Sequence, residues 1–299
     1  MVPFTLRQLE YAVAIADTGS FRVAAGRCHV SQPALSEQVA ALESALGARL
    51  FERSRRGVWL TAAGAALVAR ARSVLAEADD LGAAARGLAD PLAGVLRLGV
   101  IPTVSPYLLP RWTPAWRAAL PRLELRWLED KTPNLLAAVA EGRLDAALLA
   151  QVPDLDALSV APVCDDPFVL AAPVGHPLAT GGPLRPSDLR GAPVLLLEDG
   201  HCLRDQALTV CAWSGARELA FRATSLATLA QMVAAGLGVT LLPSVAVAVE
   251  TRAAALAVRP FADPPPLRRI VLAWRPTSPV APALEAVAAV GRSVGPPPG

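Results

Sequence analysis

The chain has 299 residues, which is enough for two domains, and its formal net charge of +2 is too small to indicate a nucleic-acid partner by itself. Arg7, Glu10 and Asp17 interrupt the first twenty residues, so we expect no signal peptide and a cytoplasmic protein. That reducing compartment disfavours structural disulfides, and any bond among the four cysteines would be transient or redox-active. The charge-free run 223–249 contains Pro243 and several polar residues, which predicts a helix, a turn and a buried strand rather than a membrane span.

Three short helices with clear end signals are predicted in the first fifty residues. Apolar residues recur at helical spacing over 6–16, and Ser20 caps a second helix at 21–27. Ser31 caps a third helix, which has Pro33 in its first turn and Gly47 after its end. A tight turn between the second and third helices predicts a helix-turn-helix.

Residues 49–60 predict a β-hairpin with a basic tip, because two short apolar runs flank Gly57. Such a wing places arginines against phosphates or in a narrow minor groove, while the third helix enters the major groove. Each signal alone is also typical of ordinary helices and solvated loops, but their combined order favours DNA binding. The residues expected at DNA are Ser31, Gln32, Pro33, Ser36, Arg53, Arg55 and Arg56, of which Gln32 can pair with adenine.

Four motifs in this region, Ser31-Gln-Pro-Ala-Leu-Ser36, Leu42-Glu43, Gly47-Ala-Arg-Leu-Phe-Glu-Arg53 and Leu60-Thr-Ala-Ala-Gly64, resemble the LysR-type transcriptional regulators. A long helix capped by Thr61 follows, and its apolar stripe packs either on its own domain or on a second copy of the chain. The resemblance implies a dimerising linker and pseudo-palindromic double-stranded DNA, with half-sites about 34 Å apart. The stripe comprises Leu67, Val68, Ala71, Val74, Leu75, Ala78 and Leu81.

Short buried strands alternate with helices from residue 94 onward, which predicts an α/β domain with parallel strands. The resemblance implies a periplasmic-binding-protein-like regulatory domain of two subdomains, with the ligand site in a cleft at the carboxyl ends of strands. The expected fold is therefore α/β with an all-α winged helix-turn-helix head. The expected boundaries are 1–60 for the head, 61–90 for the linker helix, about 91–164 and 268–299 for subdomain I, and about 165–267 for subdomain II. The proline-rich end is expected to be disordered.

Residues 198–211 contain two of the four cysteines. An Asp199-Gly200 turn precedes a helix-like run, so Cys202 is expected at a helix N-terminus beside His201 and Arg204, where N–H groups and positive side chains favour a reactive thiolate. Peroxide would oxidise that thiolate to a sulfenic acid, and a second thiol would then form a disulfide.

Two other interpretations of these cysteines stay open. In the first, Cys202 and Cys211 are small buried apolar residues, which is the interpretation we favour for Cys28 and Cys164. Metal binding by His201, Cys202 and Cys211 would offer only three ligands at irregular spacing, so we expect no metal and no cofactor.

The run 197–207, with Cys211 nine residues after Cys202, resembles the hydrogen-peroxide-sensing members of the LysR family. The resemblance implies that Cys202 is peroxidatic and Cys211 resolving, in a pocket with Thr103, Thr132 and His201; weaker candidates for this pocket are Arg204, Asp205, Arg268 and Arg269. Nine helical residues span roughly 13 Å, whereas a disulfide needs Cα atoms about 4.4 to 6.8 Å apart. The segment must therefore refold to form the bond.

Three functions remain at this point. The first is a peroxide-sensing transcription factor whose partners are DNA, hydrogen peroxide, further copies of itself in a dimer or tetramer, RNA polymerase and a glutaredoxin- or thioredoxin-type reductant. The second is a LysR-type regulator that binds a small organic effector in the cleft. The third, a thiol peroxidase, leaves the DNA-binding head unexplained, so we do not expect an enzyme.

Overall fold

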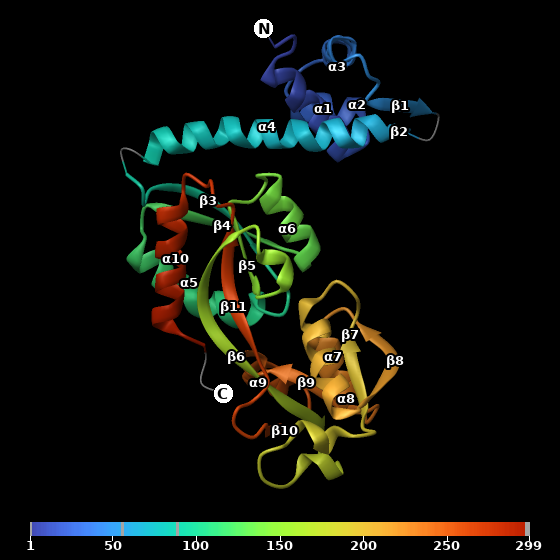
Figure 1. Cartoon of the computed structure of the whole chain (residues 1–299), viewed down its shortest axis with the longest axis vertical. Helices are drawn as coiled ribbons and strands as arrows, with labels where there is room; N and C mark the ends of the chain where they lie inside the picture. Colours follow the sequence, from blue (N-terminus) through green and yellow to red (C-terminus); the bar gives the residue numbers. More distant parts are fainter. Residues whose placement is uncertain (1, 55–56, 88–89, 297–299) are drawn as a thin grey trace. The chain divides into compact units, whose positions relative to one another are not determined.

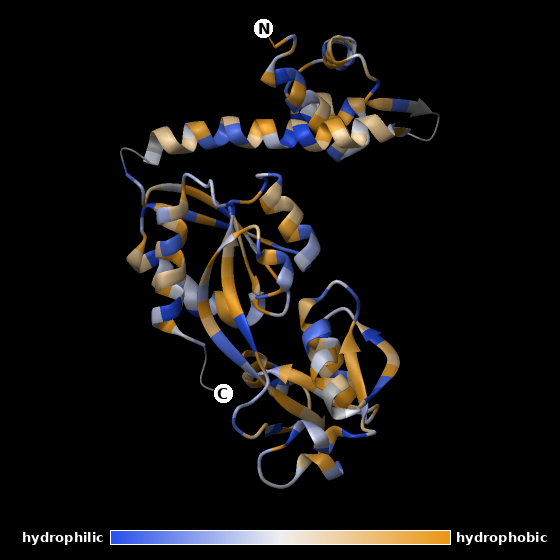
Figure 2. Ribbon diagram, viewed as in Figure 1, coloured by the Kyte–Doolittle hydropathy of each residue, from blue (hydrophilic) through white to orange (hydrophobic). Residues whose placement is uncertain are grey.

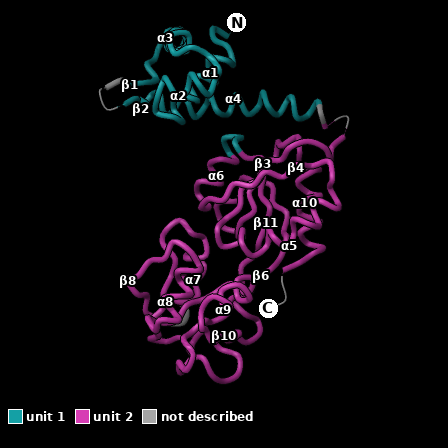
Figure 3. Tube along the Cα trace, turned by 180° about the vertical axis from the view of Figure 1, so that it is seen from behind, with its two compact units in different colours: residues 1–85, 140–143 teal, residues 86–139, 144–299 magenta. Residues whose placement is uncertain are grey.

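The computed structural model describes residues 2–54, 57–87 and 90–296, and the chain divides into two compact units. Unit 1 comprises residues 1–85 and 140–143, and unit 2 comprises 86–139 and 144–299 (Figure 3). Among the described residues no helix combines the length and the apolar character needed to cross a membrane.

The three helices of the head begin and end where the sequence predicts: α1 is Leu6–Thr18, α2 is Phe21–Arg27 and α3 is Gln32–Leu46. Each begins with a side-chain cap, because the hydroxyls of Thr5, Ser20 and Ser31 accept hydrogen bonds from N–H groups three residues further on. Helices α1 and α3 end at glycines in the left-handed conformation, with φ of 62° and 64°. Their shared core contains Ile15, Leu35 and Leu42, all fully buried.

The wing and the long helix complete unit 1. Strands β1 (Phe51–Ser54) and β2 (Gly57–Leu60) pair antiparallel, with Phe51 opposite Leu60. Helix α4 (Ala62–Gly87) follows, and the Thr61 hydroxyl accepts a hydrogen bond of 2.8 Å from the N–H of Gly64. The apolar stripe of α4 is buried in its first half and exposed towards its end. Val68 and Ala71 lie in the core of the head, whereas Leu81 is 75% exposed.

Unit 2 contains a mixed sheet with the strand order β10-β6-β11-β5-β3-β4, in which β9 also pairs with β6. The parallel pattern predicted from the segments before residue 150 holds for β3, β4 and β5, whereas the later strand β11 runs antiparallel to both β5 and β6. The long strands β6 and β11 run between the two halves of the unit (Figure 1). The strands are β3 (Gly94–Val100), β4 (Leu123–Glu129), β5 (Ala146–Ala150), β6 (Ser159–Pro173), β9 (Thr240–Pro243), β10 (Leu256–Pro260) and β11 (Leu267–Trp274).

Helices cover the sheet of the first half, and the second half is built around a smaller sheet. In the first half, α5 (Ser105–Ala119) and α10 (Ala281–Val294) lie together, while α6 (Thr132–Ala140) lies away from them (Figure 1). In the second half, β7 and β8 pair in parallel. The remaining elements are β7 (Pro193–Leu197), α7 (Cys202–Ser214), β8 (Arg217–Ala223), α8 (Leu226–Ala234), α9 (Ser244–Ala253) and the short 3-10 turns Pro153–Leu155, Pro177–Ala179 and Pro186–Leu189.

The proline-rich end, which is expected to be disordered, lies largely outside the described residues, and the regular helix α10, Ala281–Val294, precedes it. Pro282 stands in its first turn, where a missing N–H costs little, so it does not interrupt the helix. The buried side of α10 joins one continuous apolar core with the strands, whose hydrophobic colouring is evident in β5 and β11 (Figure 2). This core extends into the second half and includes Cys202 and Cys211.

Candidate redox site

Helix α7 carries both cysteines of interest. Cys202 is its first residue, directly after the N-cap His201, and Cys211 lies nine residues further along the same helix. Both side chains are buried, at 5% and 6% exposure. A straight helix separates the two Cα atoms by roughly 13 Å, so the cysteines cannot share a metal ion or a disulfide in this conformation. None of the four cysteines, all within the described ranges, forms a disulfide.

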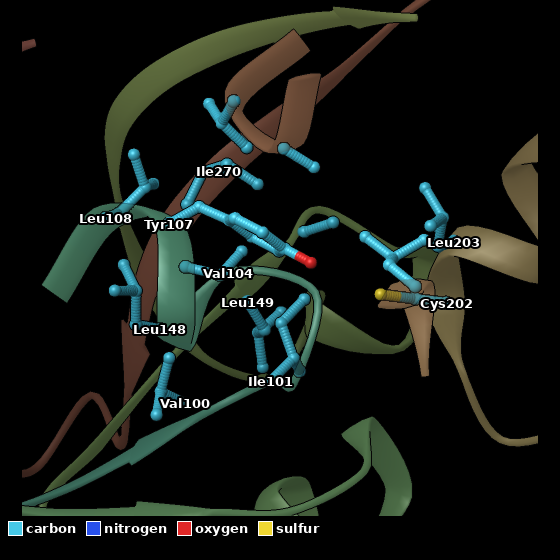
Figure 4. Packing of buried hydrophobic residues seen from close by; sticks show 14 of the residues in the cluster. Val100, Ile101, Val104, Tyr107, Leu108, Leu148, Leu149, Cys202, Leu203 and Ile270 are labelled. Atoms are coloured by element: carbon cyan, nitrogen blue, oxygen red, sulfur yellow. The ribbon is translucent and has the colours of Figure 1, made fainter. Parts of the chain in front are cut away.

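A narrow cavity adjoins Cys202, and in this conformation it has no room for a water molecule. It lies where the carboxyl ends of β3, β4 and β7 meet, and the sulfur points from α7 toward the side where Ile101 and Tyr107 lie (Figure 4). Two polar atoms here, Thr132 Oγ1 and His201 Nε2, are buried without a hydrogen-bond partner among the described residues. Such atoms suit a small polar guest. The cavity is lined by Ile101, Pro102, Thr103, Lys131, Thr132, Gly200, His201 and Cys202.

Thr103 is held in place by a buried ion pair. The Arg268 Nη1 donates to Thr103 Oγ1 at 2.8 Å, and its Nε donates to Asp166 Oδ2 at 2.9 Å, with both charged side chains fully buried. Asp166 also accepts hydrogen bonds from the Ser244 hydroxyl and the Val245 N–H at the start of α9. Because the Thr103 oxygen already accepts a hydrogen bond, its own hydrogen is left to donate to another group.

The positive side chains expected around Cys202 are largely neutralised. Arg204 Nε donates to Asp199 at 2.8 Å and its Nη1 to Glu218 at 2.6 Å, and Arg204 does not belong to the cavity lining. Burial, and next the Lys131 ammonium, lower the pKa of His201, so its imidazole is neutral near pH 7. The remaining positive potential at Cys202 comes from the N–H groups of the first turn of α7.

Two weaker candidates lie away from the small cavity. Asp205 is exposed in the first turn of α7. Arg269 follows Arg268 on β11 but is half exposed and pairs with Asp165 at 2.9 Å. The alternation of side chains along a strand separates the two arginines, so only Arg268 reaches the site.

The other three cysteines are kept in the protonated thiol form. The pKa of Cys211 is raised to about 11, first by burial and then by the nearby Glu218 carboxylate. The pKa of Cys164 on β6 is raised to about 12, first by burial and then by Asp166. Burial is also the main cause that raises the pKa of Cys28. A thiol with so high a pKa is a poor nucleophile at neutral pH.

A larger pocket of about 380 Å³ opens beside the small cavity. Cys202, Thr132 and Gly200 line both spaces, so the sulfur is reachable from the larger pocket. Its other lining residues are Pro133 and residues of 151–154 and of α7, including Asp205 and Gln206, and they mix polar and apolar side chains. This pocket is also large enough for a small organic molecule.

Three residues of the site were missed by sequence reasoning. Lys131 lines the cavity, and its place directly before Thr132 was the available signal. Asp166 and Glu218 act through Arg268 and Arg204, which are distant in sequence, so only the folded chain reveals them.

The residues expected at DNA occupy the start of α3 and the wing. Ser31 is the N-cap of α3, Gln32 and Pro33 are exposed in its first turn, and Ser36 is half-buried. In the wing, Arg53 stands opposite Val58 in the β1–β2 pair. Arg55 and Arg56 lie outside the described residues.

Two family models match the chain: the bacterial regulatory helix-turn-helix protein of the lysR family over residues 6–65, and the LysR substrate binding domain over 89–294. The chain is 48% identical to the hydrogen peroxide-inducible genes activator of Dickeya chrysanthemi, over 92% of this chain and 90% of that protein. It is 45% identical to the DNA-binding transcriptional dual regulator OxyR of Escherichia coli strain K12, over 95% and 93% of the two chains.

Solved structures agree with these relatives. A full-length OxyR variant from Pseudomonas aeruginosa is similar with a TM-score of 0.78 and 37% identity, over 97% of this chain and 98% of that one. An OxyR mutant of Corynebacterium glutamicum with hydrogen peroxide bound is similar with a TM-score of 0.66 and 37% identity, over 97% and 92% of the two chains. The chain therefore belongs to the LysR family of transcriptional regulators, and within it to the OxyR group.

Proposed function

We propose that this regulator senses hydrogen peroxide by oxidation of Cys202, followed by a reversible disulfide with Cys211. The observation that carries the proposal is the cavity at Cys202, where a sulfur at a helix N-terminus meets two buried, unpartnered polar atoms, Thr132 Oγ1 and His201 Nε2. Hydrogen peroxide is small and carries both hydrogen-bond donors and acceptors, so it bonds both atoms when the cavity widens to admit it. The identified OxyR relatives, named for hydrogen peroxide, support the same guest.

The reaction with hydrogen peroxide proceeds in two steps. The Cys202 thiolate attacks one peroxide oxygen, the O–O bond breaks, and the products are a Cys202 sulfenic acid and hydroxide, which takes up a proton to become water. Thr103 and Thr132 donate hydrogen bonds to the departing oxygen, and neutral His201 fixes the orientation of the peroxide. The Cys211 thiol then attacks the sulfenic sulfur, a disulfide forms, and a second water leaves.

The second step requires α7 to unwind, because Cys211 lies buried roughly 13 Å along the helix from Cys202. Unwinding also exposes Cys211, which removes the burial that raises its pKa and so increases its thiolate fraction. Oxidation thus disrupts helix α7 and its packing and forms a disulfide in their place. The surface around α7 changes as a result.

The partners follow from the head and from the redox cycle. Residues Ser31, Gln32, Pro33 and Ser36 of the recognition helix and Arg53, Arg55 and Arg56 of the wing contact a pseudo-palindromic promoter. The chain acts as a dimer through α4, and as a tetramer of two such dimers. RNA polymerase and a glutaredoxin- or thioredoxin-type reductant complete the cycle in the cytoplasm, where the chromosome lies.

Peptide mapping before and after one equivalent of hydrogen peroxide tests this proposal. We expect a Cys202–Cys211 linkage in the wild type and none in Cys202→Ser, whose DNA footprint should no longer change with peroxide although it still binds DNA. Cys164→Ser is the matched control, because its thiol is shielded and distant along the chain, and it should form the linkage normally. A Cys202→Ser protein that still switched with peroxide would refute the proposal.

A second candidate function rests on the larger pocket of about 380 Å³, which has room for a small organic effector. The same mapping experiment separates the two functions. If peroxide leaves both cysteines reduced, the organic-effector function is favoured and the disulfide switch is excluded.

A further inference from the structure

Asp166 lies at the centre of a buried hydrogen-bond chain that leads to the Cys202 cavity. It stands on β6 directly opposite Arg268 on β11, and neither residue belongs to the cavity lining. Both side chains are fully buried, and Asp166 Oδ2 lies 2.9 Å from both Nε and Nη2 of Arg268. Any effect of this aspartate on the reacting atoms must therefore pass through its partners.

Asp166 is itself held by two donors on a third element, α9. Its Oδ1 accepts hydrogen bonds from the Ser244 hydroxyl at 2.9 Å and from the Val245 N–H at 3.1 Å. The two carboxylate oxygens thus have different partners, since Oδ1 fixes the aspartate to α9 and Oδ2 receives the guanidinium of Arg268. This division leaves the carboxylate a single orientation, and the orientation of the guanidinium is set with it.

The guanidinium of Arg268 in turn fixes Thr103, which lines the cavity. Arg268 Nη1 donates to Thr103 Oγ1 at 2.8 Å, and Nη2 donates to the Thr103 backbone oxygen at 2.9 Å. Thr103 is buried, and among the residues that the structure describes its hydroxyl hydrogen has no protein acceptor. A charged donor on the hydroxyl oxygen also strengthens the bond that the hydroxyl itself donates, because consecutive hydrogen bonds polarise one another. Thr103 is thereby left with one unused donor.

Fold stability alone does not account for this ion pair. Removing two charges from water is costly, and replacing a buried pair by well-packed apolar residues often leaves a protein equally stable or more so. Here the pair has a third partner, a hydroxyl of the redox cavity. We propose that Asp166 is a positioning residue of the peroxide reaction: through Arg268 it fixes the Thr103 hydroxyl as a donor to the oxygen that departs when Cys202 is oxidised. This inference rests on the proposed oxidation of Cys202.

The test measures the rate constant for loss of the Cys202 thiol with hydrogen peroxide in the full-length protein, by rapid alkylation and mass spectrometry. Asp166→Asn keeps the side-chain size and an oxygen for α9 but weakens the hold on Arg268. The rate constant should therefore fall about tenfold, which is less than the roughly 100-fold that loss of a whole oxyanion donor costs. Asp165→Asn is the matched control, because it alters the neighbouring cross-strand pair with Arg269, which is half exposed, and should leave the rate constant unchanged.

A double-mutant cycle separates positioning from a general structural effect. Thr103→Val removes the donated hydrogen bond and should lower the rate constant about 100-fold. In that background Asp166→Asn should cause no further loss, because the hydroxyl that it positions is already absent. Losses that multiply would overturn the proposal, since Asp166 would then act by a route that does not pass through Thr103.

A second variant guards against unfolding, because Asp166→Asn leaves the Arg268 charge buried without its carboxylate partner, which costs stability. Asp166→Asn combined with Arg268→Met removes the buried charge and keeps an acceptor for Ser244 and Val245. Its rate constant should also fall about tenfold, since Thr103 has lost the donor that orients it. An unchanged rate constant in either folded variant would overturn the proposal. A wild type whose Cys202 did not react with hydrogen peroxide would instead overturn the proposed function.

Discussion

Burial and hydrogen bonding decide what each cysteine of this chain can do. Cys211 and Cys164 are held as thiols, with pKa values raised to about 11 and about 12, and burial is the main cause for both. Cys202 differs in its position, because it begins a helix and lines two cavities. We therefore propose that Cys202 is the cysteine that reacts, because it is accessible and lies at a helix end.

Alkylation with iodoacetamide should report this difference for Cys211. In the folded, reduced protein its thiolate fraction at pH 7 is about a hundredfold below that of an ordinary cysteine, since each pKa unit is tenfold. Its alkylation rate should rise about tenfold per pH unit from about pH 7 to about pH 10, still below the raised pKa.

The control for this prediction is the same protein unfolded in urea, where Cys211 should react at the rate of a free thiol. The measurement is mass spectrometry of the peptide that carries Cys211. Equal rates in the folded and unfolded proteins would contradict the burial of the Cys211 thiol in the reduced protein.

The residues of the site were only partly predictable. His201 and Thr132 could be placed near Cys202 from the turn before α7 and from the strand ends, and both line its cavity. Arg204 was expected to activate the sulfur, but its guanidinium pairs with Glu218 on β8, a strand that the sequence pattern did not reveal. Long-range ion pairs leave no local trace in a sequence, which limits predictions of this kind.

Helix α7 is the element whose stability should set the balance between the two redox states. Its thirteen residues begin at Cys202 and end at Ser214, followed by the left-handed Gly215. The proposed disulfide is incompatible with this helix, so any change that weakens the helix favours the oxidised form. A weaker helix should therefore increase the equilibrium constant for disulfide formation, which can be measured.

Thr209, which is exposed between the two cysteines, provides the test position. Thr209→Gly and Thr209→Ala differ by about 1 kcal/mol in helix propensity. In a glutathione redox titration, the equilibrium constant for disulfide formation should be about fivefold larger for the glycine variant than for the alanine variant.

Glu285 offers a matched pair outside the switch, because it is exposed on α10. Glu285→Gly and Glu285→Ala should have equal redox equilibria. If the two Thr209 variants also agreed with each other, α7 would remain folded in the disulfide form and the unwinding step would be wrong.

Helices whose ends are set by neighbouring residues were predicted closely. Strands that form only by pairing with distant parts of the chain were not. The three head helices follow from hydroxyl caps and glycine ends, which act within a few residues. Strand β6 begins at Ser159, in a stretch whose sequence does not have the pattern of a strand. Pro162, two aspartates and Pro167 give its first part the composition of a loop, and pairing with β11 imposes the strand there.

At the scale of the whole molecule, function depends on charge distribution rather than on total charge. The formal net charge of +2 gives no hint of a DNA partner, whereas the sequence carries three arginines, at 53, 55 and 56, within the segment predicted to be the wing. The domain boundaries expected from the sequence stay a prediction, although the two compact units part within α4, at residue 85. Leu81 near that point is 75% exposed, as a helix that packs on a second copy requires.

The wing and the recognition helix should make separable contributions to DNA binding. Each arginine that contacts a phosphate releases counterions, so Arg53→Ala with Arg56→Ala should weaken binding to every duplex and reduce the slope of log K against log salt by about two. Gln32→Ala should leave that slope unchanged and cost about 1 to 3 kcal/mol of binding free energy only on duplexes that carry the adenine it reads.

Fluorescence anisotropy over a salt series, on specific and scrambled duplexes, measures both effects. Arg217→Ala, at an exposed position on β8 of unit 2, is the control and should change neither quantity. An unchanged slope in the double variant would contradict the wing assignment, because phosphate contacts cannot be lost without a change in counterion release.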